Sequence, residues 1–128
     1  MIKLNYRDAK PIYEQVKDDL RRLMITGAIR EGEQIPSVRE MAVRLSINPN
    51  TIQKAYHDLE QEGYIYMISG KGSFAAPLGE VSAGRKREVA SMFEEVVREL
   101  LSLGCSPEEL KSWIQELAEG GDRDDQSQ

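Results

Sequence analysis

Residues 35–74 read IPSVREMAVRLSINPNTIQKAYHDLEQEGYIYMISGKGSF, and this stretch decides the fold. Ser37 is followed three residues later by Glu40, a spacing that forms a capping box and predicts the start of a short helix. The apolar residues that follow repeat with helical spacing, and Ser46 then begins a short turn. A second helix and a glycine-rich hairpin complete the stretch, which is the element order of a winged helix-turn-helix.

The second helix of this stretch has clear start and stop signals. Asn48 predicts its cap, and Pro49 suits its first position because that position needs no amide hydrogen. We expect the helix to run from Pro49 to Glu62 and to end at Gly63, a residue that closes helices without strain.

This predicted helix has an apolar face and a polar face. With about 100° of rotation per residue, the apolar face consists of Ile52, Ala55, Tyr56 and Leu59. The opposite face carries Asn50, Lys54, His57 and Gln61, with Gln53 at its edge. Alone, the pattern is also that of an ordinary surface helix. Preceded by a capped helix and followed by a hairpin, it favours a helix that enters the major groove of DNA.

The hairpin is predicted from Tyr64 to Ala76, with its turn at residues 69–72. Gly70 and Gly72 allow close approach of the backbone to a partner, and Lys71 at the tip can reach a phosphate or the minor groove. A plain hairpin turn with one solvated lysine is the alternative interpretation.

The remaining sequence predicts three more helices. One runs from about Pro11 to Thr26, one from Ala83 to Leu103, and one follows a second capping box at Ser106. We therefore expect a mainly α fold with a small β-wing. Its predicted parts are a DNA-binding domain at residues 1–78, a two-helix hairpin at 79–119 and a disordered tail at 120–128.

The two C-terminal helices carry apolar stripes but too little chain for a core of their own. We predict that they pair with a second copy of the hairpin in a two-fold dimer, although packing within one chain remains the alternative. The predicted dimer interface comprises Val89, Met92, Phe93, Val96, Val97, Leu100, Leu110, Trp113, Ile114 and Leu117.

Charge is distributed unevenly along the 128 residues, whose net charge is −5. Residues 1–78 hold 11 Lys/Arg and 10 Asp/Glu, a net of +1, and residues 79–128 hold 6 and 12, a net of −6. A near-neutral first part can still bind DNA through a local basic face. A single cysteine and the lack of a signal peptide lead us to expect a cytoplasmic protein. No apolar run is long enough to span a membrane, so we expect no membrane partner.

The sequence offers little for catalysis. His57 and Cys105 are the only histidine and cysteine, and they are far apart. There is no phosphate-binding loop and no zinc-ligand spacing. We expect no enzyme activity, no metal and no cofactor. A protein-interaction adaptor that uses the winged helix is the alternative function, and salt dependence of binding would distinguish it from DNA binding.

Five ordered stretches resemble the GntR family of bacterial transcriptional regulators, and the short C-terminal part resembles its YtrA-like branch. These stretches are PIYEQ at 11–15, IPSVREMA at 35–42, NPNTI at 48–52, EGYI at 62–65 and GKGSF at 70–74. The resemblance implies a dimeric repressor that binds an inverted repeat in double-stranded DNA. It also makes control of a transporter operon a prediction, because such members often lie beside transporter genes.

The polar pattern and the resemblance together predict the residues that contact DNA. They are Ser37, Arg39, Arg44, Asn48, Asn50, Thr51, Gln53, Lys54, His57, Lys71 and Gly72. Many family members carry arginine where this chain has Pro49 and Gln53, so guanine readout is not expected there, and Gln53 suits adenine better. For Arg39 the alternative is a salt bridge with a neighbouring carboxylate.

A small-molecule effector is a further hypothesis. Met92, Phe93 and Trp113 could line a small pocket in the hairpin interface, although a plain dimer core would use the same residues. Titration of Trp113 fluorescence with candidate metabolites tests this hypothesis, and a flat response would count against it.

Overall fold

The computed structural model describes residues 2–120 and separates into two compact units, residues 1–86 and 87–128. Residues 79–86, predicted to belong to the two-helix hairpin, lie in the first unit. The predicted tail lies outside the described residues except for Gly120.

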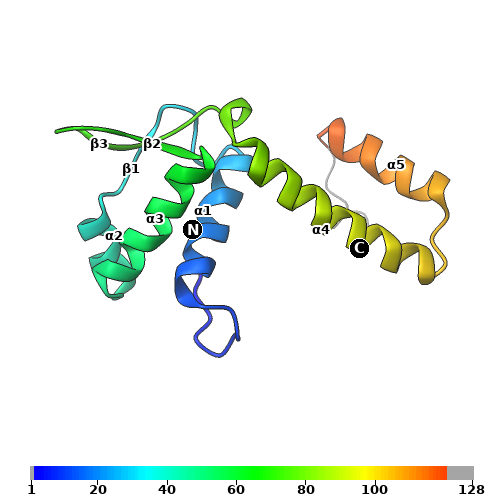
Figure 1. Cartoon of the computed structure of the whole chain (residues 1–128), viewed down its shortest axis with the longest axis horizontal. Helices are drawn as coiled ribbons and strands as arrows, with labels where there is room; N and C mark the ends of the chain where they lie inside the picture. The colour runs from blue at the N-terminus through cyan, green and yellow to red at the C-terminus, as the bar shows by residue number, and fades with distance from the viewer. Residues whose placement is uncertain (1, 121–128) are drawn as a thin grey trace. The chain divides into compact units, whose positions relative to one another are not determined.

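The first unit contains three helices and a small sheet, followed by a short 3-10 turn (Figure 1). Its elements are α1 (Ile12–Ile25), β1 (Gln34–Ile35), α2 (Val38–Leu45), α3 (Pro49–Glu62), β2 (Ile65–Ile68), β3 (Gly72–Ala75) and η1 (Leu78–Glu80). Helix α3 packs against both α1 and α2, and β2 follows it directly. This is the winged helix-turn-helix that the sequence predicted.

The turn between α2 and α3 follows the predicted capping chemistry. The Glu40 amide donates to Ser37 Oγ at 3.0 Å, and the Glu40 carboxylate accepts from the Ser37 amide at 3.2 Å, so the capping box is complete. Ser46 adopts a left-handed conformation with φ 55°, which ends α2. The Asn48 side chain then accepts from the Asn50 amide at 2.8 Å and starts α3. The predicted bounds of α3 are confirmed.

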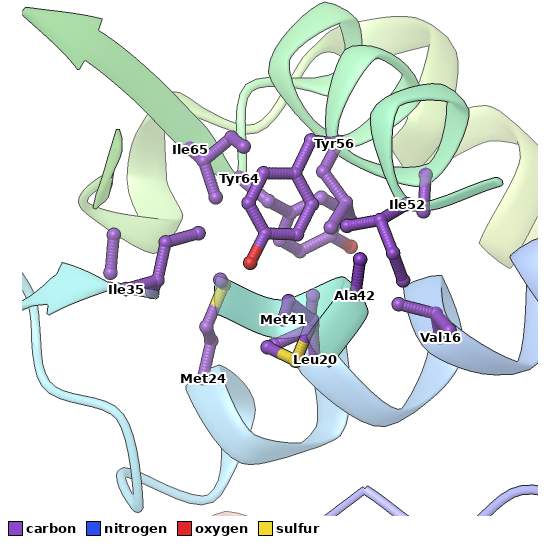
Figure 2. Packing of buried hydrophobic residues seen from close by; sticks show 13 residues of the cluster. Val16, Leu20, Met24, Ile35, Met41, Ala42, Ile52, Tyr56, Tyr64 and Ile65 are labelled. Atoms are coloured by element: carbon purple, nitrogen blue, oxygen red, sulfur yellow. The ribbon is translucent and has the colours of Figure 1, made fainter. Parts of the chain in front are cut away.

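The core of the first unit lies where α1, α2, α3 and the sheet converge. Figure 2 shows Val16 and Leu20 of α1, Met41 of α2 and Ile52 of α3 directed into one cluster. Val16, Ile52 and Leu59 have no exposed surface, and Leu20 is 1% exposed. The four residues predicted for the apolar face of α3 are all buried.

The three strands form an antiparallel sheet in the order β1-β3-β2. The wing consists of β2 and β3, and Tyr66 stacks on its cross-strand partner Phe74 with ring centroids 5.6 Å apart. The prediction that Gly72 belongs to the turn was wrong, because it is the first residue of β3 and pairs with Ile68. The Lys71 amide donates to the Ile68 carbonyl at 2.9 Å and closes the turn.

The segment of residues 2–5, before α1, is held against that helix. The Lys3 amide donates to Asp19 Oδ2 at 2.9 Å, and the Asn5 amide donates to Gln15 Oε1 at 2.7 Å. Ile2 and Leu4 pack against the core at the same time. No periodic pattern in the sequence predicts this packing, because these contacts join a non-helical segment to residues more than one helical turn away.

Helix α4 (Ala83–Ser102) continues into the second unit, which also holds α5 (Pro107–Ala118). Gly104, with φ 97°, lies between the two helices, and Ser106 and Glu109 form the predicted second capping box. Leu110 is buried. Most other apolar side chains of this unit remain exposed, as described below for the proposed function.

We predict that Tyr56→Phe lowers the free energy of unfolding by about 1–2 kcal/mol. The Tyr56 hydroxyl donates to the Pro36 carbonyl at 2.7 Å and so joins α3 to the segment before α2. Burial raises the pKa of this hydroxyl, which keeps it protonated as a donor. Urea denaturation measures the change. Tyr6→Phe, at a side chain 68% exposed, is the control and should have no effect. Equal stability of all three proteins would contradict the prediction.

Candidate nucleic-acid interface

The outward face of α3 is polar and accessible. Asn50, Gln53 and His57 are exposed, and Thr51 is half-buried. The core fixes this orientation because Ile52, Ala55 and Leu59, on the opposite side of the helix, have no exposed surface. These side chains can therefore reach base edges without any rotation of the helix, as direct readout in a major groove requires.

Two predicted contact residues, one at the cap of α3 and one on the helix, already have partners within the chain. The Asn48 side-chain oxygen accepts from the Asn50 amide in the helix cap, and its amide nitrogen remains available to DNA. The Lys54 ammonium lies 4.0 Å from the centroid of the Tyr13 ring on α1. Such a contact at an exposed site is worth about 0.5–1 kcal/mol, so a phosphate can displace it.

Helix α2 presents two arginines, Arg39 in its first turn and Arg44 in its last turn. Arg39 is exposed, and among residues 2–120 no carboxylate forms a salt bridge with it. The alternative of a salt bridge at Arg39 therefore has no support in the described part of the chain. Arg44 lies 4.0 Å from Glu40 Oε2, but its side chain is 64% exposed, so this pair is weak. Ser37, Arg39 and Arg44 line one shallow recess on α2.

The tip of the wing is supported by a residue that was not among the predicted DNA contacts. The Gln34 side chain donates from Nε2 to the Lys71 carbonyl at 2.8 Å. A Cβ atom at Gly72 would lie 2.8 Å from the same Nε2, so a larger residue here would displace the Gln34 side chain. Gln34 comes from β1, far from the wing in sequence, and only the pairing of Gln34 with Phe74 brings it there.

Four carboxylates of the first unit are held in salt bridges with cations of α1. Lys17 pairs with two acids of α3 at 3.2 and 3.3 Å, and Arg21 forms two salt bridges at 2.7 Å. A further pair joins Arg22 and Asp19. The acids held in these pairs are Asp18, Asp19, Asp58 and Glu62. Arg39, Arg44 and Lys71 remain as exposed cations on α2 and the wing, which provides a local basic surface despite the near-neutral total.

The geometry excludes some chemistry within the described residues. No group of three or more His, Cys, Asp or Glu among residues 2–120 could hold a metal ion. None of the described helices is both long and apolar enough to cross a membrane. A capped helix pair, an exposed polar recognition face and a braced wing together define a winged helix-turn-helix DNA-binding protein.

Comparison with known proteins agrees with this class. Residues 12–74 match the family described as bacterial regulatory proteins, gntR family. The chain is 32% identical over 130 residues to the HTH-type transcriptional repressor YtrA of Bacillus subtilis (strain 168), which covers 98% of this chain and 100% of that protein. The chain belongs to the GntR family and is a DNA-binding transcriptional regulator, not an enzyme.

Solved structures show the same fold. A transcriptional antiterminator from Listeria monocytogenes EGD-e superposes with a TM-score of 0.74 at 34% identity, over 92% of this chain and 90% of that one. AraR(DBD) in complex with operator ORR3 superposes with a TM-score of 0.52 at 31% identity, over 58% of this chain and 89% of that one.

We predict that Arg39→Ala weakens binding to the cognate operator by about tenfold while leaving the thermal transition unchanged. The reason is that this guanidinium is exposed and without a salt bridge in the described residues, so its removal affects DNA and not packing. Fluorescence anisotropy with labelled operator measures the loss. Arg98→Ala, at a side chain 76% exposed on α4, is the matched control and should bind as the wild type does. Equal affinity of Arg39→Ala and wild type would remove Arg39 from the interface.

Proposed function

We propose that this chain is a dimeric repressor that binds an inverted-repeat operator. Helix α3 enters the major groove with Asn50, Thr51, Gln53 and His57, and the wing at residues 70–72 lies along the backbone or in the minor groove. The observation that carries this proposal is the exposed polar face of α3 on a helix whose other side is fully buried.

The proposal that this chain represses transcription is supported by its similarity to a transcriptional repressor. The relative from Bacillus subtilis (strain 168) is named as a repressor, and the match covers 100% of that protein. Operator DNA is bound by AraR(DBD) in its solved complex. We extend both properties to this chain because the elements that carry them, α2, α3 and the wing, lie within the matched residues. We also propose a cytoplasmic location and control of a transporter operon, which the resemblance to the YtrA-like branch implies.

Dimerisation is supported by the apolar surface of the second unit. Six of the ten predicted interface residues are between 42% and 57% exposed: Val89, Met92, Phe93, Val96, Ile114 and Leu117. Val97, Leu100 and Trp113 are half-buried, and Leu110 is buried. Two helices cannot bury both sides of such stripes by themselves, and a two-fold partner is the commonest way to cover them.

We predict that Phe93→Glu produces monomers, because a carboxylate on the apolar stripe cannot be buried against a second copy without a large desolvation cost. Multi-angle light scattering measures the mass. Phe93 is 53% exposed, so the substitution should leave the single chain folded by circular dichroism. Glu95→Ala, at an exposed position on the same helix, is the control and should remain dimeric. A dimeric Phe93→Glu protein would place the interface elsewhere.

The central test is a fluorescence anisotropy titration of the DNA upstream of the gene that encodes this chain with the purified protein, in the presence of competitor DNA. We expect binding that resists competitor and weakens with salt by about 0.9 log units per log unit of salt for each phosphate neutralised. A protein-interaction adaptor, the alternative function, is not favoured by the family relationship. Absence of specific binding to this DNA and to a genomic operator selection would defeat the proposed function.

A further inference from the structure

Strand β1 is too short to support the tip of the wing through its backbone. It pairs with β3 through Gln34 and Ile35, and the next residue is Pro36. Proline has no amide hydrogen, so it cannot donate to a continued ladder. The tip at residues 69–71 therefore extends past β1 as a two-stranded hairpin, and such a hairpin is only marginally stable in water by itself.

The Gln34 side chain supplies the contact that a longer β1 would make. Its Nε2 donates to the Lys71 carbonyl at 2.8 Å. The Lys71 amide donates to the Ile68 carbonyl at 2.9 Å within the turn. Because the backbone amide and the backbone carbonyl on the two sides of its Cα atom are both held, the direction in which the Lys71 side chain leaves the backbone is fixed.

Gly72 leaves room for this bond. Gln34 lies opposite Phe74, and side chains two residues apart in a strand point to the same face, so Gln34 and position 72 share one face of the sheet. A Cβ atom at Gly72 would lie 2.8 Å from Gln34 Nε2. The backbone of Gly72 has φ 123°, a conformation that residues with a Cβ atom rarely adopt. The sequence at the tip thus suits both the turn and the approach of Gln34.

The bond lies on the face of the sheet opposite to the core. Ser73, the neighbour of Phe74 in β3, is only 6% exposed, whereas Gln34 is exposed. An exposed hydrogen bond adds little to the stability of a fold, because water replaces either partner when the bond is lost. The consequence of the Gln34 bond is therefore the orientation of Lys71, and not the stability of the domain.

We propose that Gln34 is a positioning residue for DNA binding, which holds Lys71 so that its ammonium group meets a phosphate of the DNA backbone. This inference rests on the proposed function, because it requires the wing to lie against DNA. Gln34 need not touch DNA itself. Without its bond, the tip of the wing must become ordered at the moment of binding, and that ordering reduces affinity.

The expected consequence is a change in the salt dependence of binding without any change in charge. Each neutralised phosphate contributes about 0.9 log units of affinity per log unit of salt. Lys71→Ala should reduce this slope by about 0.9, because it removes the ammonium group. Gln34→Met should reduce the slope in the same direction, although both residues are neutral. A side chain that served folding alone would change stability and leave the slope as it is.

The test is a fluorescence anisotropy titration of labelled operator at several salt concentrations with wild type, Gln34→Met, Lys71→Ala and the double variant. Methionine is unbranched like glutamine but has no hydrogen-bond donor. We expect the double variant to bind as Lys71→Ala does, with no further loss of affinity or slope. Gln115→Met is the matched control, because Gln115 Nε2 also donates at 2.8 Å, to Glu119 on an exposed surface of the second unit. It should have the wild-type affinity and slope.

A second variant keeps the test decisive if Gln34→Met fails to fold. Gln34→Asn retains the amide group but shortens the side chain by one methylene, so its nitrogen cannot reach the Lys71 carbonyl from the same backbone position. It should lower the slope as Gln34→Met does. Thermal unfolding should show the wild-type transition for each folded variant.

Three results would overturn the inference. The first is a wild-type slope in the folded Gln34 variants, with or without a loss of affinity. The second is a wild-type slope in Lys71→Ala, which would remove Lys71 from the phosphate contacts. The third is a double variant in which the two losses add, because Gln34 would then act independently of Lys71. A wild-type protein that binds no DNA would instead defeat the proposed function, so the two failures are distinguishable.

Discussion

The burial of one face of α3 is the constraint on which the rest of the structure depends. Ile52, Ala55 and Leu59 are fully buried against α1 and α2, and burial of a large aliphatic side chain contributes about 1.5–3 kcal/mol. Any rotation of α3 about its axis would expose these groups. The same packing that stabilises the domain therefore also determines which side chains face a DNA groove, so stability and recognition are coupled in one helix.

Charge pairing explains how an acidic protein can present a basic surface. Asp58 and Glu62 of α3 pair with Lys17 and Arg21 of α1, and Asp18 and Asp19 pair with Arg21 and Arg22 within α1. The exposed cations of α2 and the wing have no comparable set of close acidic partners among the described residues. Net charge consequently says little about the interface, because the field near DNA depends on where the unpaired charges lie.

The two units differ in how completely they bury their apolar side chains. The first unit has a core of its own and a complete set of caps, whereas the second leaves apolar stripes half exposed. In the proposed dimer, the first unit binds a half-site and the second unit joins the two copies.

The sequence by itself determined the helices, their caps and the inward face of α3, because these depend on interactions between residues within about one turn of each other. Ser37 with Glu40, Asn48 with Pro49, and Gly63 each acted locally, so their roles could be predicted. Only the tertiary structure revealed Gln34 beneath the wing tip, Lys54 against Tyr13, and Ser82 bonded to Glu62. Each of these contacts joins segments far apart in the chain, and no local pattern of residues specifies which distant groups a fold will bring together.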